Sequence, residues 1–199
     1  MGYKRLSKGN VLEAVKAAVH DAHKRYEEMS DGWWLQHAPE YLITTEVATR
    51  IHKEFNTYVY MEASMRRIWN TENNTEIDGE IIDEHGNDKS SLRSDISIWN
   101  RQNNDIYCCI EIKKTSSTDL IEKDIEKLKM IIRANYCKIG IVAAYSSFVK
   151  KEKTHEETVR RISDGHGVSG SYEIIKTKLA DAEGFIPAVM TFLVEAEIK

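Results

Sequence analysis

Residues 93–114 constrain the fold of this chain more than any other stretch, because they predict two β-strands joined by a polar turn. Ile96 and Ile98 alternate with Asp95, Ser97 and Trp99. Residues 106–112 are rich in β-branched and aromatic side chains and in cysteine. The intervening residues 100–105 are all polar. We therefore expect a half-buried β-hairpin, with one side of the ribbon facing a core and the other facing solvent.

A single register of this hairpin separates polar from apolar side chains. If the turn centres on Asn103, the facing pairs are Ile96 with Ile110, Ile98 with Cys108, Ser97 with Cys109, Trp99 with Tyr107, Asp95 with Glu111 and Arg93 with Lys113. The turn lacks the Asn-Gly or Asp-Gly sequence that would set its geometry, so a slip of one or two residues stays open.

This register brings together side chains that suit metal chemistry. Glu111 and Lys113 are two residues apart on one strand and share a side of the ribbon, and Asp95 joins them from the neighbouring strand. Two carboxylates about 5 Å apart repel each other unless a cation lies between them, and their oxygens suit Mg²⁺ or Mn²⁺. With the Lys113 ammonium beside that ion to hold a water or a phosphate oxygen, the set predicts metal-assisted phosphodiester hydrolysis.

Asp95 and the run Glu111-Ile112-Lys113 resemble the D…(D/E)xK signature of the PD-(D/E)XK nuclease superfamily, although Ser94 stands where the nominal proline would be. The resemblance implies that Asp95 and Glu111 bind Mg²⁺ or Mn²⁺, that the carbonyl oxygen of Ile112 joins them, and that Lys113 assists the nucleophile. It also implies a restriction-endonuclease-like fold and a nucleic-acid substrate, with DNA favoured over RNA.

The same resemblance implies a further acidic residue on the helix before the first core strand. We predict this helix over residues 39–56, and by helical phase Glu40 lies on the apolar face with Val47. Glu40 is therefore the preferred catalytic candidate, unless it only complements the helix dipole. Glu46 replaces it if the helix begins at residue 44 or 45, and Glu62, on the following predicted strand, is a third choice.

The order of the predicted elements favours an α/β fold with a mixed central sheet flanked by helices. The elements are a helix over 10–29 capped by Asn10, a helix over 39–56, a strand over 57–64, the hairpin, a helix over 118–135, a strand over 136–145, a helix over 150–162, a loop over 163–171, and strands over 172–176 and 186–196. The strand–helix–strand unit from the hairpin to residue 145 predicts a parallel pair.

We expect a single domain whose organisation follows the resemblance. The restriction-endonuclease-like core spans about residues 39–145, the N-terminal helix precedes it, and residues 150–199 form a C-terminal extension with extra strands. Residues 70–91 form a long polar connection within this core.

Composition limits how the chain could contact nucleic acid. The 199 residues carry a net charge of −4, so any such contact must come from local patches. The most basic region is the helix predicted over 150–162, where a phosphate-binding role competes with a solvated helix face. Trp33 and Trp34 could stack on bases, but packing onto a core is the preferred interpretation.

Other features exclude several classes of protein. The three cysteines lack metal-site spacing and are expected to be reduced and buried, which favours a reducing compartment. The sequence shows neither an apolar run of membrane-spanning length nor a signal peptide, so we expect a cytoplasmic protein without a membrane partner. A phosphate-binding P-loop and a paired CxxC zinc pattern are also absent.

The predicted function is a Mg²⁺-dependent nuclease, an activity that in the family serves restriction, repair or defence. One alternative is a nuclease-like interaction or regulatory module, in which Asp95 pairs with Arg93 or Lys113, and Glu111 with Lys113 or Lys114. Another is a nuclease subunit that acts only as a homodimer or with a partner protein, which the net charge of −4 fits.

Overall fold

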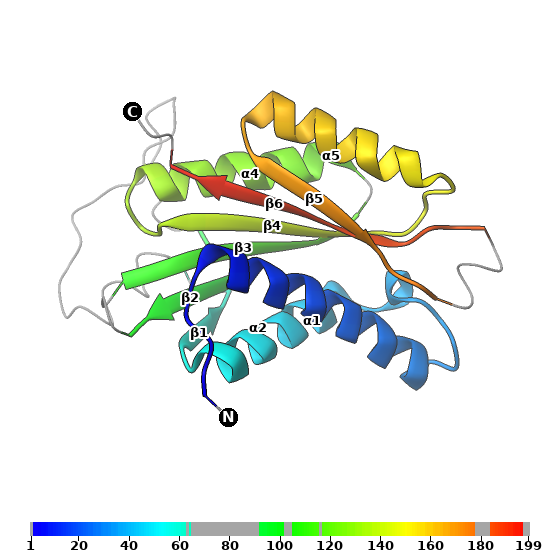
Figure 1. The fold of residues 1–199 in the computed structure, drawn as a ribbon, viewed down its shortest axis with the longest axis horizontal. Coiled ribbons are helices and arrows are strands. Elements are labelled where there is room, and N and C mark those ends of the chain that lie inside the picture. The colour runs from blue at the N-terminus through cyan, green and yellow to red at the C-terminus, as the bar shows by residue number, and fades with distance from the viewer. Residues whose placement is uncertain are drawn as a thin grey trace.

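The computed structural model describes residues 2–62, 64, 92–101, 105–115, 117–177 and 184–196. In this part of the chain a six-stranded sheet has the order β1-β2-β3-β4-β6-β5 (Figure 1). The strands are β1 Tyr58–Met61, β2 Ile96–Asn100, β3 Asp105–Lys114, β4 Ile139–Ser146, β5 Ser169–Ile174 and β6 Ala188–Glu195. β3 and β4 are parallel and the other neighbours are antiparallel, so the predicted mixed sheet is confirmed.

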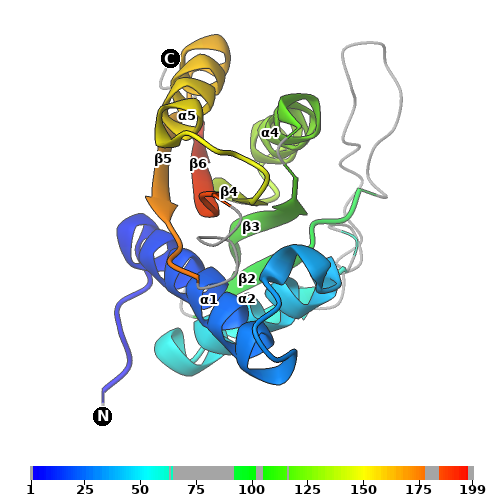
Figure 2. The same ribbon diagram turned by 90° about the vertical axis from the view of Figure 1, so that its right-hand side faces the viewer.

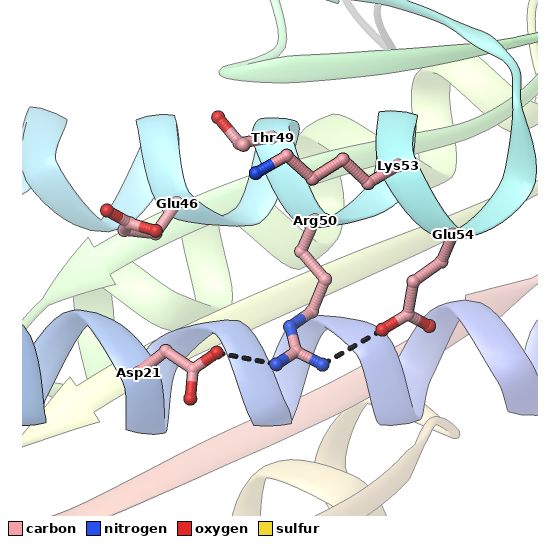
Figure 3. Close-up of a pocket in the computed structure, with 6 residues that line it drawn as sticks. All are labelled: Asp21, Glu46, Thr49, Arg50, Lys53 and Glu54. Carbon is pink, nitrogen blue, oxygen red and sulfur yellow. Dashed lines mark hydrogen bonds and ion pairs between the residues drawn. The ribbon is translucent and has the colours of Figure 1, made fainter.

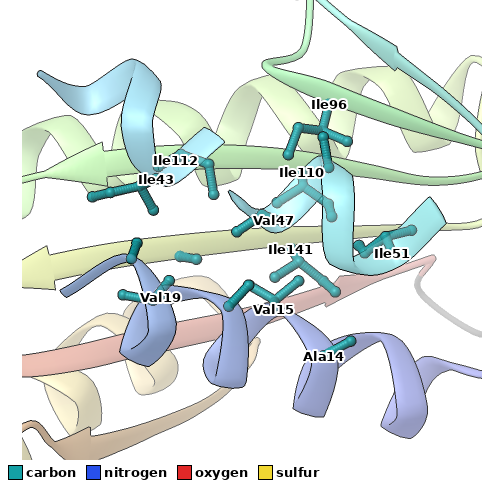
Figure 4. Close-up of a cluster of buried hydrophobic side chains, with 14 of the residues drawn as sticks. Ala14, Val15, Val19, Ile43, Val47, Ile51, Ile96, Ile110, Ile112 and Ile141 are labelled. Carbon is teal, nitrogen blue, oxygen red and sulfur yellow. The ribbon is translucent and has the colours of Figure 1, made fainter. Parts of the chain in front are cut away.

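Helices cover both faces of the sheet, with α1 and α2 on one face and α4 and α5 on the other (Figures 1 and 2). The helices are α1 Lys8–Met29, the short 3₁₀ helix η1 Leu35–His37, α2 Glu40–Phe55, α4 Thr118–Arg133 and α5 Glu152–His166. Each face has its own apolar core, and Figure 4 shows the one between α1, α2 and the sheet. This three-layer α/β arrangement places β3 in the interior.

The β2–β3 hairpin has the predicted register over the half that is farther from the turn. Ile96 pairs with Ile110 and Ile98 with Cys108. Beyond Ile98 a β-bulge shifts the pairing, so Trp99 faces Ile106 and the predicted pairing with Tyr107 is wrong. A bulge adds a residue to one strand, which the alternation of side chains alone does not reveal.

The expectation of a half-buried hairpin is also wrong, because both sides of the ribbon are buried. Ile96 and Ile110 pack against the α1 and α2 core, while Trp99 and Cys109 pack against the α4 and α5 core. Polar groups on the second side therefore lie under α4, with Glu111 fully buried and Lys113 partly exposed. This change in environment alters the chemistry of the candidate site.

The unit β3–α4–β4 forms the predicted parallel crossover. The apolar residues of α4 recur at helical spacing, and they are buried against the sheet: Ile121, Ile125, Leu128 and Ile132. Gly140 on β4 lets this helix approach closely, because a Cβ at that position would lie 2.9 Å from the Cβ of Leu128. The close packing sets the height of α4 above the strands.

Several element boundaries differ from the predictions. α1 begins at Lys8 and is capped by Ser7, whose Oγ accepts a hydrogen bond from the Asn10 backbone N–H, so the predicted cap at Asn10 is wrong. α5 continues to His166 and β5 begins at Ser169, so most of the predicted loop over 163–171 is regular structure. The polar connection predicted over 70–91 lies outside the described residues.

The cysteines and one of the two neighbouring tryptophans are buried. Cys108, Cys109 and Cys137 are buried free thiols, as expected. Trp34 packs into the protein as expected, whereas Trp33 remains 52% exposed. Within the described residues no helix has the length and apolar character needed to cross a membrane.

Candidate active site

Asp95 lies directly before β2 and close to the part of β3 that carries Glu111. It immediately precedes the Ile96–Ile110 pair, and its charge contributes to the raised pKa of Glu111. Its Oδ2 accepts a hydrogen bond of 2.7 Å from the backbone N–H of Ile112. Asp95 is thus attached to the same short segment of β3 that carries the other motif residues.

Glu111 is a fully buried carboxylate on the side of the sheet that α4 covers. Its Oε2 lies 2.6 Å from the ammonium nitrogen of Lys127 on α4, and its Oε1 has no hydrogen-bond partner among the described residues. Burial raises the pKa of Glu111 to about 8; repulsion from Asp95 and Asp124 adds to the rise, and Lys127 opposes it. With this pKa, the Glu111 side chain of the metal-free protein is mostly protonated at neutral pH.

Lys113 lies on the same side of β3 and remains positively charged at neutral pH. Its ammonium nitrogen is 3.3 Å from Asp124 Oδ2 on α4. Burial lowers the pKa of Lys113, but attraction to Asp124, then to Asp95, Glu40 and Glu111, outweighs this and leaves the pKa raised. Lys113 can therefore act as a fixed cation for a phosphate or a water, and not as a proton acceptor.

The structure places Glu40 at the edge of this group of charges. Glu40 is the first residue of α2, and its Oε2 accepts a hydrogen bond of 2.8 Å from the backbone N–H of Lys114. The Lys114 ammonium in turn donates to the carbonyl oxygen of Ala38. These two bonds hold the start of α2 against the end of β3. Glu40 is thus bonded to Lys114, the residue that follows Lys113, and its charge also attracts Lys113.

The two other acidic candidates lie differently. Glu46 forms an ion pair with Arg25 of α1 and lines a pocket between α1 and α2, which Figure 3 shows together with the Asp21–Arg50–Glu54 ion pairs. It is therefore directed toward α1 and away from the motif. Glu62 follows β1 with an exposed side chain, and its backbone N–H donates to the carbonyl oxygen of Asp95 at 3.1 Å. Of the three, Glu40 is the one joined to β3.

Asp124 and Lys127 are the site residues that sequence reasoning missed. The helical pattern of α4 assigns Lys127 to the polar positions, yet the Lys127 ammonium turns toward the sheet to reach Glu111 and also donates to the carbonyl oxygen of Arg93 at 3.2 Å. Asp124 is 8% exposed and lies between the two lysines, 3.8 Å from Lys127. Their spacing of three residues on a helix was the available signal, because it puts both side chains on one side of α4.

These residues are too few to enclose a divalent cation by themselves, so they fit one only if water or a ligand supplies the rest of its coordination shell. Among the described residues, no three carboxylate, histidine or cysteine side chains converge closely enough to enclose a metal ion. Mg²⁺ commonly binds proteins through one or two carboxylates, with waters and substrate phosphates completing its octahedron. Asp95 and the unpartnered Oε1 of Glu111 meet that lower requirement.

Comparison of the chain with protein-family models, with curated proteins and with solved structures returned no match.

Proposed function

We propose that this protein is a metal-dependent nuclease with a restriction-endonuclease-like core formed by α2, β1, β2, β3, α4 and β4. The observation that carries the proposal is the buried Glu111 side chain, which lies near Asp95 and shares a strand side with a protonated Lys113. Its Oε1 has no hydrogen-bond partner among the described residues. A buried, unpartnered carboxylate oxygen is costly, and a cation between the two carboxylates relieves that cost. The order of these elements supports the proposal, because it is the order implied by the sequence resemblance.

Each residue then has a role that its contacts support. Asp95 and Glu111 hold Mg²⁺ or Mn²⁺, and the carbonyl oxygen of Ile112 is the third protein ligand implied by the motif. When bound, Mg²⁺ supplies Lewis acidity toward the phosphate and the attacking water. Lys113, held by Asp124, orients the water or stabilises the charge that develops on the phosphate. Glu40 extends the carboxylate set and secures the end of β3.

The proposal is tested by calorimetric titration of Mn²⁺ into the wild-type protein and into Asp95→Asn. We expect binding in the wild type that is lost in Asp95→Asn. Asp105→Asn is the matched control, because Asp105 begins the same strand but pairs with Lys138 at 2.6 Å, away from the motif. Asp105→Asn should bind Mn²⁺ like the wild type. Equal binding by all three proteins would overturn the proposed site.

Cleavage assays on single- and double-stranded DNA and RNA follow once Mn²⁺ binding is established. Lys113→Ala should reduce cleavage by roughly 10²-fold or more while the protein stays folded. Cleavage that persists in Lys113→Ala and Asp95→Asn would show that a contaminant, or another site, is responsible.

A second candidate function is a nuclease-like interaction module. It is favoured by the ion pairs of α4, because Lys127 already neutralises Glu111 and Asp124 already neutralises Lys113. These partners come from the helix, and not from the hairpin lysines expected from the sequence. Absence of Mn²⁺ binding in the wild type, with or without added nucleic acid, would select this function over the nuclease.

A further inference from the structure

Three segments that are far apart in the sequence meet at the end of the sheet where β3 and β4 finish. One is the connection between α1 and α2, the second follows β4, and the third precedes β6. Trp34 joins them, because its ring is edge-on to Phe148 with centroids 5.5 Å apart and stacks on Phe185 at 5.3 Å. Figure 2 views the molecule from this end. The three segments therefore lie side by side at this end of the sheet.

Aromatic rings are presented to solvent on this surface. Trp33 is 52% exposed and Phe148 is 54% exposed, although both are large apolar side chains. Trp33 lies edge-on to His37 with centroids 4.7 Å apart, and Phe148 lies edge-on to Phe185 at 5.6 Å. We call Trp33, His37, Phe148 and Phe185 the aromatic platform. Trp34, which is 2% exposed, anchors it to the protein.

The platform is bordered by positive charge. The ammonium nitrogen of Lys150 lies 4.9 Å from the centre of the Phe185 ring, and Lys151 beside it is exposed. No ion pair within the described residues engages Lys150 or Lys151, whereas Lys153 pairs with Glu157. A cation beside the rings, with a second exposed lysine next to it in the sequence, suits a ligand that carries both flat aromatic groups and negative charge.

The platform lies close to the candidate active site. Lys114 pairs with Tyr145 across the parallel strands, and Phe148 is three residues beyond Tyr145, which corresponds to about 10 Å along an extended chain. On the other side, the Lys114 ammonium bonds to the carbonyl oxygen of Ala38, directly after η1. These contacts place the platform beside the end of β3 that carries both lysines, with Lys114 facing α2 and Lys113 facing α4.

We propose that the aromatic platform, with Lys150 and Lys151, binds unpaired bases of single-stranded nucleic acid and leads the strand to the site formed by Asp95, Glu111 and Lys113. Each base has a flat face that can stack on an exposed ring, whereas a duplex hides those faces between its own base pairs. The lysines attract the phosphates of the same strand. The inference rests on the proposed function, because it names the substrate class of that site.

The test is fluorescence anisotropy of a short labelled oligo-dT strand and of a labelled hairpin duplex, measured in buffer with chelator. Without metal, binding is separated from cleavage and from metal affinity. The variants are Trp33→Leu and Phe148→Leu, which keep an apolar side chain but remove the ring. The matched control is Tyr58→Leu, because Tyr58 is 47% exposed and lies under Arg101 at the opposite end of the sheet.

We expect the strand to bind more tightly than the duplex, and each platform variant to weaken strand binding about tenfold. Tyr58→Leu should bind the strand like the wild type, and Lys150→Gln should reduce the dependence of binding on salt. Preference for the duplex, no binding of either probe, or equal binding by all variants would each overturn the platform. Mn²⁺ titration of the same variants keeps the two proposals apart, since loss of the platform should leave Mn²⁺ binding intact.

Discussion

The ammonium nitrogen of Lys127 on α4 lies 2.6 Å from Oε2 of Glu111 on β3, and the Glu111 side chain is completely buried. This pair joins the candidate metal ligand to a helix that carries no part of the sequence motif. Because the carboxylate is removed from water, the charge of Lys127 compensates for hydration that Glu111 has lost. The stability of the metal-free protein therefore depends on this contact.

Replacing Lys127 by methionine should destabilise the metal-free protein in a pH-dependent manner. At about pH 9 Glu111 is ionised, and loss of its partner should cost roughly 3 kcal/mol of unfolding free energy. At about pH 6 Glu111 is protonated, so the cost should be much smaller. Urea denaturation at both pH values measures the difference. Lys129→Met is the control, because Lys129 pairs with the half-exposed Glu126 and should matter little at either pH.

Glu111→Gln should remove a specific pH dependence of stability. The pKa of Glu111 is raised from 4.5 to about 8 in the folded protein. The folded state therefore binds this proton more tightly than the unfolded state, and its stabilising effect is complete below about pH 4.5 and lost as the pH rises to about 8. The slope is up to about 1.4 kcal/mol per pH unit in chelator. Urea denaturation at a series of pH values measures the free energy of unfolding. If this free energy depended on pH equally in Glu111→Gln and the wild type, the assignment would be contradicted.

Asp95→Ala and Asp95→Asn should differ in stability although neither binds Mn²⁺. The amide oxygen that Asp95→Asn introduces can still accept the Ile112 backbone hydrogen bond, and the repulsion with Glu111 disappears, so stability should hold or rise. Asp95→Ala leaves that N–H without its acceptor, which should cost about 1–2 kcal/mol. Thermal denaturation in chelator compares them. Strong destabilisation in Asp95→Asn would favour a structural ion pair over a metal site.

Lys113→Met should reduce cleavage by roughly 10²–10³-fold, because it removes the charge that faces the phosphate. Mn²⁺ affinity should not fall, since Lys113 is not a ligand and its charge repels the metal. Single-turnover cleavage and Mn²⁺ titration separate these two effects. Lys123→Met, on the exposed side of α4, is the control for a lost positive charge and should retain full activity. A comparable loss in Lys123→Met would indicate a general charge effect.

Gly140→Ala should displace α4 and with it the two helix residues of the site. The added Cβ would lie 2.9 Å from the Leu128 side chain, and such overpacking costs about 1–3 kcal/mol. Gly165→Ala is the opposite case, because a Cβ there has nothing within 4 Å and alanine favours the helix by about 0.5–1 kcal/mol. Denaturation midpoints should therefore move in opposite directions. Equal midpoints would show that α4 adjusts its height without cost.

The sequence determined features that depend on short-range periodicity. Alternation along residues 96–98 and 108–110 was enough to predict how the two strands pair in the half of the hairpin farther from the turn. The four–three–four spacing of apolar residues was enough to predict α4. The prediction that Asp95 lies near Glu111 was an extension of that register by one residue. The bulge after Ile98 did not follow, because both the predicted and the observed pairing place an aromatic residue beside an acceptable neighbour.

The tertiary structure decided which groups surround the motif. Burial of both hairpin sides arises because helices cover both faces of the sheet, and this burial gives Glu111 its raised pKa. Lys127 and Asp124 join the site because α4 packs at a particular height, while Trp34 contacts Phe148 because β4 ends near η1. Local periodicity tells which side chains share a side of one element, but contacts between elements depend on how those elements pack together.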